Sequence, residues 1–265
     1  MQELKYYYIV ELQFLGFRFH GWQKQSEFKT VQGEIEKVIN KVLVNENAKI
    51  LGGSRTDSMV SAEKYLFSLT LKNGKIDDIN SFIETLNYVL PADIRILKII
   101  PSAHRLNMIN IPKYKEYRYY FSFGKEKPHP FSAPVITHIR GEMDLELMKV
   151  GAKLFEGTHS FRQYCYRPHE TKDFIKTIDR CEILKNDQYQ ANFFPVQTYF
   201  LKVVGHSFMR HQVRFMAGTL FRLALNEIAI EDIIQSLKGE SDEFLGFIAP
   251  ASGLILHDII LEEQR

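Results

Sequence analysis

The chain has 265 residues, of which 45% are hydrophobic and 25% are charged, and its formal net charge is +2. These values are ordinary for a globular protein, and the length suffices for one large domain or two modest ones. The small net charge alone predicts no polyanionic partner, and the two cysteines, Cys165 and Cys181, exclude a disulfide framework and a four-thiolate metal site.

The N-terminal segment indicates a strand and not a targeting sequence. Lys5 precedes an aromatic and apolar run that Glu11 and Gln13 interrupt, so residues 4–15 are expected to form a strand. No apolar run approaches the length needed to cross a bilayer. We therefore expect a cytoplasmic protein with no membrane partner, whose cysteines are buried or incidental thiols.

The first half of the chain alternates strand and helix patterns. One amphipathic helix is predicted over residues 31–44, after an N-cap at Thr30, and a second begins at Asp77 and Asp78 and stops before Pro91. Strand patterns lie before, between and after these helices. The resulting order, β-α-β-β-α-β, indicates the α+β class, with helices on one face of an antiparallel sheet.

The loop from Gly52 to Asp57 follows a short strand and is the first candidate site. Its paired glycines let the backbone approach a ligand closely, and Arg55 and Asp57 make a charged pair at the end of a strand. A surface turn in which Asp57 bonds its own backbone explains the same residues. In an earlier loop, Trp22 is interpreted as a packing anchor and Gln23 as a candidate polar contact to a ligand.

The second half follows a stretch without periodicity, and we predict subdomains over residues 1–105 and 106–265. Lys115, Tyr117 and Arg118 lie in a strand pattern that buries one face and presents Tyr or Arg groups on the other. An edge strand with solvated charges is the simpler interpretation. The remaining predicted elements are a helix from Asp144 to near Gly157, strands over 175–184 and 199–204, a short helix over 232–238 and a last strand over 254–261.

A helix is also predicted over residues 208–218, and it carries two arginines. Arg210 and Arg214 are four residues apart and would share one helical face, either solvated or directed at a phosphate or a carboxylate. The histidines show no metal-ligand spacing, and no phosphate-binding or dinucleotide-binding glycine motif is present. The sequence therefore supports neither a metal nor a nucleotide cofactor.

Taken together, the motifs resemble those of the TruA-type tRNA pseudouridine synthase family, in the same order. The matching segments are His20–Gln25, Thr30–Gly33, Ser54–Asp57, Asn87–Ile94, Tyr117–Tyr119, Phe208–Gly218 and Gly253–Leu256. The chain differs after the aspartate, where Met59 replaces the family's glycine and Ser61 its histidine, and the arginine of a family F-H-A-R segment is absent from residues 106–109.

The resemblance implies a pseudouridine synthase fold, in which two α/β subdomains with antiparallel sheets flanked by helices surround a central active-site cleft. It implies that the protein isomerises uridine to pseudouridine in tRNA, in the anticodon arm (tRNA positions 38–40), without a cofactor and as a homodimer. A catalytically silent tRNA-binding protein or chaperone on the same fold is the alternative, suggested by the altered loop after Asp57.

The resemblance also assigns roles to residues. Asp57 is the expected nucleophile, Arg214 the cation that keeps it ionised, and Arg55 a contact on the RNA side. Tyr117 is expected to stack on the target uracil. The other expected substrate contacts are Gln23, Lys115, Arg118, Arg210 and Leu254.

Overall fold

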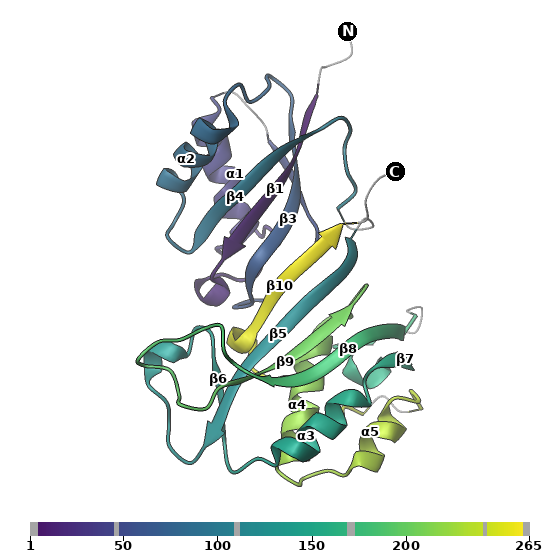
Figure 1. Cartoon of the computed structure of the whole chain (residues 1–265). Helices are drawn as coiled ribbons and strands as arrows, with labels where there is room; N and C mark the ends of the chain where they lie inside the picture. Colours follow the sequence, from purple (N-terminus) through teal and green to yellow (C-terminus); the bar gives the residue numbers. More distant parts are fainter. Residues whose placement is uncertain (1–4, 45–47, 109–111, 169–172, 241–242, 262–265) are drawn as a thin grey trace. The chain divides into compact units, whose positions relative to one another are not determined.

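The computed structural model describes residues 5–44, 48–108, 112–168, 173–240 and 243–261 (Figure 1). The chain packs as two compact units: unit 1 comprises residues 1–113 and 256–265, and unit 2 comprises residues 114–255. The subdomain boundary after residue 105 stays a prediction from the sequence. The two compact units divide later, after residue 113, and the C-terminal segment belongs to unit 1. No described helix is long and apolar enough to cross a membrane.

Unit 1 is a sheet with two helices. Its strand order is β4-β1-β3-β10, with β2 paired to β3, and β1 runs antiparallel to both β3 and β4. Helices α1 and α2 pack side by side (Figure 1). The elements are β1 (Tyr6–Phe14), α1 (Val31–Val42), β2 (Lys49–Gly52), β3 (Ser61–Leu71), α2 (Ile79–Val89), β4 (Ile94–Ser102) and β10 (Leu254–Leu261), whose residues from Leu256 onward belong to this unit.

Local chemistry explains the bounds of both helices in unit 1. The Thr30 hydroxyl accepts a hydrogen bond from the Gly33 N–H at 3.3 Å, and the Asp78 carboxylate accepts bonds from the first turn of α2. The two predicted helices and their N-caps are therefore confirmed. Strand β10 is tied to β3 by an ion pair between Lys64 and Asp258, 2.8 Å apart.

Unit 2 holds the remaining strands of the sheet together with three described α-helices, of which α3 packs against β8. Its strand order is β5-β9-β8-β7; β6 pairs with β5 in parallel, and the other described pairs are antiparallel. The elements are β5 (Pro112–Gly124), β6 (Thr137–Arg140), α3 (Leu145–Lys153), β7 (Gly157–Ser160), β8 (Ile175–Lys185), β9 (Tyr199–Gly205), α4 (Gln212–Ala224) and α5 (Ile230–Ser236). Short 3₁₀ helices cover Gly16–Arg18, Pro130–Ser132, Arg162–Tyr164 and Ala251–Gly253. The predicted α+β class is confirmed.

Three predictions for the second half are wrong in detail. Helix α3 ends at Lys153, well before Gly157, where a positive φ of 103° begins strand β7. Helix α4 begins only at Gln212, because His211 takes a left-handed φ of 63°. Arg210 therefore precedes the helix and shares no helical face with Arg214. Finally, β5 does not present one polar face, since the six residues from Tyr117 to Ser122 are all buried.

Candidate active site

The loop that carries Asp57 is held by backbone hydrogen bonds on both sides. At its start, the Gly53 N–H donates to the Leu66 carbonyl of β3 at 2.9 Å. In its middle, the Thr56 carbonyl accepts a bond from the Trp22 N–H at 3.3 Å. At its end, the Met59 N–H donates to the Phe19 carbonyl at 3.0 Å. These bonds fix the backbone on either side of Asp57.

An aromatic cluster lies beneath this loop and explains the first glycine. Trp22 is 1% exposed and stacks on Tyr65, with ring centroids 4.0 Å apart. A Cβ atom at Gly52 would lie only 2.3 Å from both the indole nitrogen and the Tyr65 hydroxyl, so only glycine fits there. The Tyr65 hydroxyl also donates to the Ser54 carbonyl. The predicted anchoring role of Trp22 is therefore confirmed.

The two departures from the family motif are accommodated in the backbone. Met59 takes a φ of 68°, in the left-handed region that favours glycine, which is the family's residue at this position. Ser61 is buried, and its hydroxyl accepts a bond from the Gly16 N–H at 2.9 Å. The loop therefore keeps a glycine-like turn without glycine, at the cost of local strain.

The predicted residues of unit 1 differ in exposure. Asp57 is half-buried, and Arg55, two residues before it, is exposed. Gln23 is also exposed, and it follows Trp22, whose backbone bonds to Thr56. The structure therefore brings Gln23, Arg55 and Asp57 into one region, with the carboxylate the most enclosed of the three.

Several predicted residues of unit 2 lie on strands. Tyr117 is 7% exposed, and its ring meets Phe208 edge-on with centroids 5.1 Å apart. Leu254, the first residue of β10, is buried. Lys115 is half-buried, and burial lowers the pKa of its ammonium group. Tyr117 and Lys115 point to the same face of β5, because they are two residues apart.

Arg214 lies in the first turn of α4 and is half-buried. Its Nε donates to the Ala249 carbonyl at 2.7 Å, and the Ala249 N–H donates back to the Arg214 carbonyl at 3.2 Å. The neighbouring Tyr119 is fully buried, which raises the pKa of its hydroxyl, and that hydroxyl donates to the Pro250 carbonyl at 2.7 Å. The guanidinium plane of Arg214 is thus fixed by the segment that precedes β10.

Arg118 lies on the opposite face of β5, in a buried polar network. Its Nε donates to the Glu116 carboxylate at 2.7 Å, its Nη1 bonds to Gln188, and its guanidinium carbon lies 5.0 Å from the Phe200 ring centroid. The Lys202 ammonium lies 3.1 Å from the same carboxylate. These contacts give Arg118 a structural role, and its assignment as a substrate contact stays a prediction.

The carboxylate of Glu116 should make the stability of the protein depend on pH. Burial alone would raise the pKa of Glu116, but Arg118 and Lys202 outweigh burial, so the net pKa is lowered. A carboxyl group whose pKa is lower in the folded than in the unfolded protein stabilises the fold at any pH above its unfolded-state pKa, about 4.3. This stabilisation is lost as the pH falls through the folded-state pKa. Glu116→Gln should therefore destabilise the protein by about 3 kcal/mol at neutral pH and by less in acid.

Urea unfolding of wild type and Glu116→Gln from neutral to acidic pH measures this difference. Glu182→Gln serves as the control, because its ion pair with Lys153 is more exposed and should contribute less than about 1 kcal/mol. A stability difference between wild type and Glu116→Gln that stays constant across this pH range would contradict the prediction.

Arg210 lies apart from Arg214, beside Tyr166. The guanidinium carbon of Arg210 is 4.9 Å from the Tyr166 ring centroid, and its backbone carbonyl accepts a bond from the Tyr166 N–H. Sequence reasoning overlooked Tyr166, and no periodicity or motif could have found it. The contact depends on the positive φ of His211, which takes Arg210 out of the helix.

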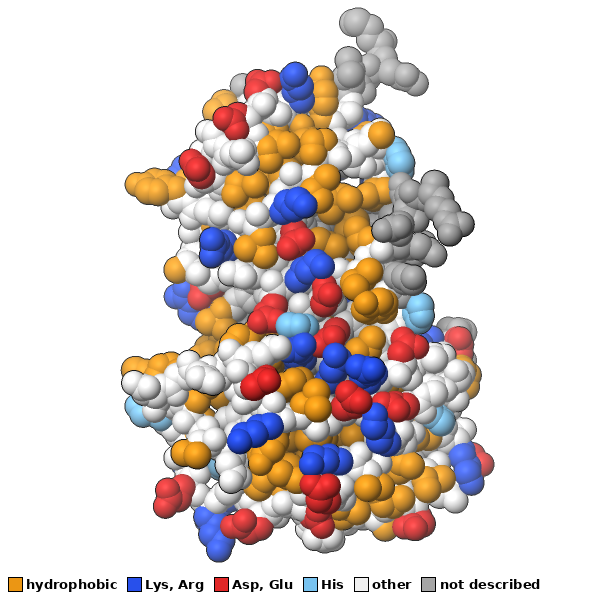
Figure 2. Space-filling model, viewed as in Figure 1, with side chains coloured by type: hydrophobic (Ala, Val, Ile, Leu, Met, Phe, Trp, Pro, Cys, Tyr) orange, Lys and Arg blue, Asp and Glu red, His pale blue; other side chains and the backbone are white. Residues whose placement is uncertain are grey.

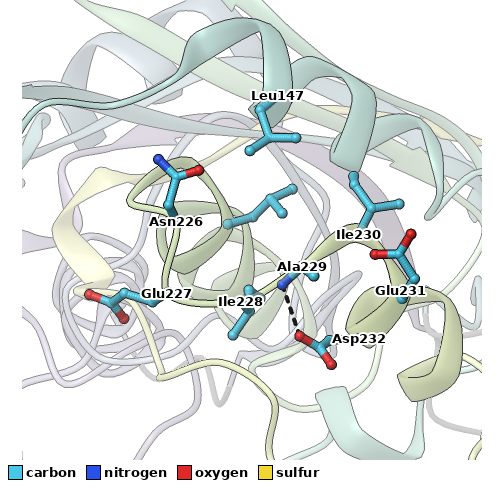
Figure 3. Close-up of a pocket in the computed structure, with 9 residues that line it drawn as sticks. Leu147, Asn226, Glu227, Ile228, Ala229, Ile230, Glu231 and Asp232 are labelled. Carbon is cyan, nitrogen blue, oxygen red and sulfur yellow. Dashed lines mark hydrogen bonds between the residues drawn. The ribbon is translucent and has the colours of Figure 1, made fainter.

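A pocket of about 520 Å³ opens elsewhere in unit 2, between α3 and the connection from α4 to α5 (Figure 3). Apolar side chains, such as Leu147 and Ile230, and the acidic side chains of Glu227, Glu231 and Asp232 line it. The Asp232 carboxylate accepts a bond from the Ala229 N–H at 2.8 Å and so caps α5. None of the sequence-predicted site residues lines this pocket, and we assign it no part in the candidate site.

The surface charges of the described residues are mixed. Figure 2 shows Lys and Arg side chains interspersed with Asp and Glu on the face drawn. This face is therefore not broadly basic, and contact with a polyanion here would depend on local groups of cations. Among the described residues, no group of three or more His, Cys, Asp or Glu side chains could hold a metal ion.

Comparison with known proteins gives the class and then the family. A family model described as tRNA pseudouridine synthase matches residues 152–260. The tRNA pseudouridine synthase A of Dictyoglomus thermophilum is 31% identical, covering 94% of this chain and 97% of its own length. The enzyme of that name from Aquifex aeolicus is also 31% identical, over 96% of this chain and 99% of its own length. The one from Phytoplasma mali is 31% identical over 95% of this chain and 97% of its own length.

The family model, which matches less than half of the chain, agrees with the names of the relatives, which are pseudouridine synthases. Because relatives at 31% identity cover nearly its whole length, the chain belongs to the tRNA pseudouridine synthase A (TruA-type) family. The family indicated by the sequence motifs is thus confirmed.

Proposed function

We propose that this protein isomerises uridine to pseudouridine in tRNA, with Asp57 as the nucleophile. The observation that carries the proposal is the half-buried Asp57 on a loop fixed by backbone bonds, in a chain of the tRNA pseudouridine synthase A family. The reaction breaks the N1–C1′ bond of uridine, turns the base and forms a C5–C1′ bond, while C5 loses a proton and N1 takes one up. It needs neither an oxidant nor a reductant.

The burial of the residues supports their separate roles. A half-buried carboxylate is partly shielded from water, which suits a nucleophile acting on a base taken out of its stack. The exposed Arg55 is suited to contact phosphate or to hold the flipped nucleotide. Tyr117 is proposed to stack on the uracil, and Lys115, Gln23 and the other predicted contacts to bind the surrounding RNA.

Arg214 is proposed to keep Asp57 ionised at neutral pH, because a neighbouring cation favours the charged form of a carboxylate. Arg214→Ala should then reduce turnover sharply, by about 10²-fold or more. Arg214→Lys should recover little, because lysine keeps the charge but cannot keep the planar Nε bond to the Ala249 carbonyl. Single-turnover rates measure this effect, and near-normal turnover by Arg214→Ala would rule out the assignment.

The finer points of the proposal concern the target and the assembly. We propose that the modified uridines lie in the anticodon arm of tRNA, that the protein acts as a homodimer, and that it works in the cytoplasm, where its substrate is used. The family membership supports these points, and the names of the relatives specify tRNA as the substrate.

Tritium release tests the proposed reaction directly. Wild-type protein should release tritium to water from tRNA labelled at C5 of uridine, whereas Asp57→Ala should release none. The alternative, a catalytically silent tRNA-binding protein, predicts tight tRNA binding without release, unchanged in Asp57→Ala. Absence of release from a total tRNA pool, with wild-type protein that is shown to be folded, would reject the enzyme.

A further inference from the structure

Three side chains surround the ring of Tyr166 in unit 2. The guanidinium carbon of Arg210 lies 4.9 Å from the ring centroid, and that of Arg167 lies 5.2 Å from it. The imidazole ring of His211 lies 4.9 Å away, inclined by 34°. Two cations and an imidazole thus share one aromatic ring, and we call these four residues the Tyr166 cluster.

The backbone and a small apolar core hold the cluster in place. The Tyr166 N–H donates to the Arg210 carbonyl at 3.0 Å, which joins the segment around residue 166 to the segment that leads into α4. Directly beside these residues in the chain, Cys165 and Met209 are buried together with Phe174. The two arginines therefore extend from a fixed base.

Two residues of the cluster have an unusual backbone conformation. Arg167 has a φ of 52° and His211 a φ of 63°, both in the left-handed region. Residues other than glycine seldom adopt this region, and strained backbone concentrates at functional sites. The structure describes four residues other than glycine with a positive φ, and the remaining two are Met59 in the Asp57 loop and Asn226. Two of these four positions therefore contact the Tyr166 ring.

The two arginines of the cluster form no ion pair with any residue that the structure describes. Arg167 and Arg210 are both exposed. An aromatic face attracts a guanidinium but satisfies none of its five N–H donors. Two such groups beside one ring favour an anion that can accept several of these donors. Phosphate oxygens match the fork geometry of a guanidinium.

We propose that the Tyr166 cluster binds backbone phosphates of the RNA substrate, at nucleotides other than the uridine that reacts. This inference rests on the proposed function, because that function makes RNA the partner. Arg167 and Arg210 bind the phosphates, and Tyr166 is the platform that positions both guanidiniums. Contacts to phosphate position the RNA and add affinity, so the cluster acts on KM and on salt dependence and not on the chemical step.

Binding of a fluorescently labelled tRNA, measured by anisotropy over a series of KCl concentrations, tests the cluster. Arg167→Gln and Arg210→Gln should each raise Kd roughly threefold to tenfold. Each should also reduce the slope of log Kd against log[KCl] by about one. Tyr166→Leu should raise Kd, whereas Tyr166→Phe, which keeps the ring, should bind like wild type. Arg140→Gln, an exposed arginine on β6, is the matched control and should change neither quantity.

Turnover separates this proposal from the proposed function. At saturating tRNA, the cluster variants should retain the wild-type kcat, and their thermal unfolding midpoints should match that of Arg140→Gln. If the double variant Arg167→Gln/Arg210→Gln binds tRNA with the wild-type Kd and salt dependence, the cluster proposal is overturned while the enzyme stands. If wild type binds tRNA through the cluster but releases no tritium, the enzyme is overturned and the cluster stands.

Discussion

Asp57→Asn is expected to lower the rate of pseudouridine formation by at least about 10⁴-fold, because asparagine keeps the shape of the side chain but cannot act as the nucleophile. The backbone bonds at Gly53, Thr56 and Met59 that anchor the loop do not use the Asp57 side chain. The variant should therefore fold and bind tRNA within about threefold of the wild-type Kd. Single-turnover tritium release and anisotropy measure the two effects.

Asp77→Asn is the matched control for this variant. It removes an exposed carboxylate of the same unit, whose ion pair with Lys75 is long, at 3.9 Å. It should leave turnover and stability unchanged. If Asp57→Asn kept a tenth or more of the wild-type turnover, the nucleophile would have to be another residue.

Trp22→Ala is expected to destabilise the protein by about 3–5 kcal/mol, the largest effect that we predict on folding. The indole ring is almost fully buried and stacks on Tyr65, with Phe67 a further neighbour at 5.8 Å between centroids. Removing it leaves a cavity directly beneath the loop that carries Asp57. Urea unfolding should show this loss, and turnover should fall in the fraction of protein that remains folded.

Phe28→Ala provides the comparison within the same connection, because Phe28 is 47% exposed and contacts only the exposed ring of His20 among the described aromatic pairs. It should cost less than about 1 kcal/mol. Equal destabilisation by the two substitutions would show that Trp22 is not the anchor of the loop.

The elements that the sequence predicted well are those with a strong local signal. Helix α1 has Thr30 as its N-cap and a repeated apolar face, and helix α2 has Asp78 before a similar pattern. The alternation of strands and helices along the first half of the chain was also predicted from its pattern. The start of α4 was missed because it depends on a positive φ at His211, and histidine carries no signal for that conformation.

The residues of the candidate site also fall into those that the sequence could identify and those that it could not. Asp57 could be identified because glycines and a charged pair surround it and because the segment matches the family motif. The burial of Arg118 could not be predicted, because it is set by Glu116, Gln188 and Lys202, of which Gln188 and Lys202 are far from it in the chain. Long-range packing therefore buries Arg118, which the local pattern of the strand could not predict.

The order of the two units along the chain bears on how the protein is made. Unit 2 is one continuous segment, whereas unit 1 is split, and β10 joins β3 only after unit 2 has left the ribosome. Domains tend to fold as they emerge during synthesis. The unit with Asp57 is therefore completed last, and a chain that stops short of residue 256 lacks most of β10, the strand that neighbours β3. Premature termination before this point thus cannot yield a complete unit 1.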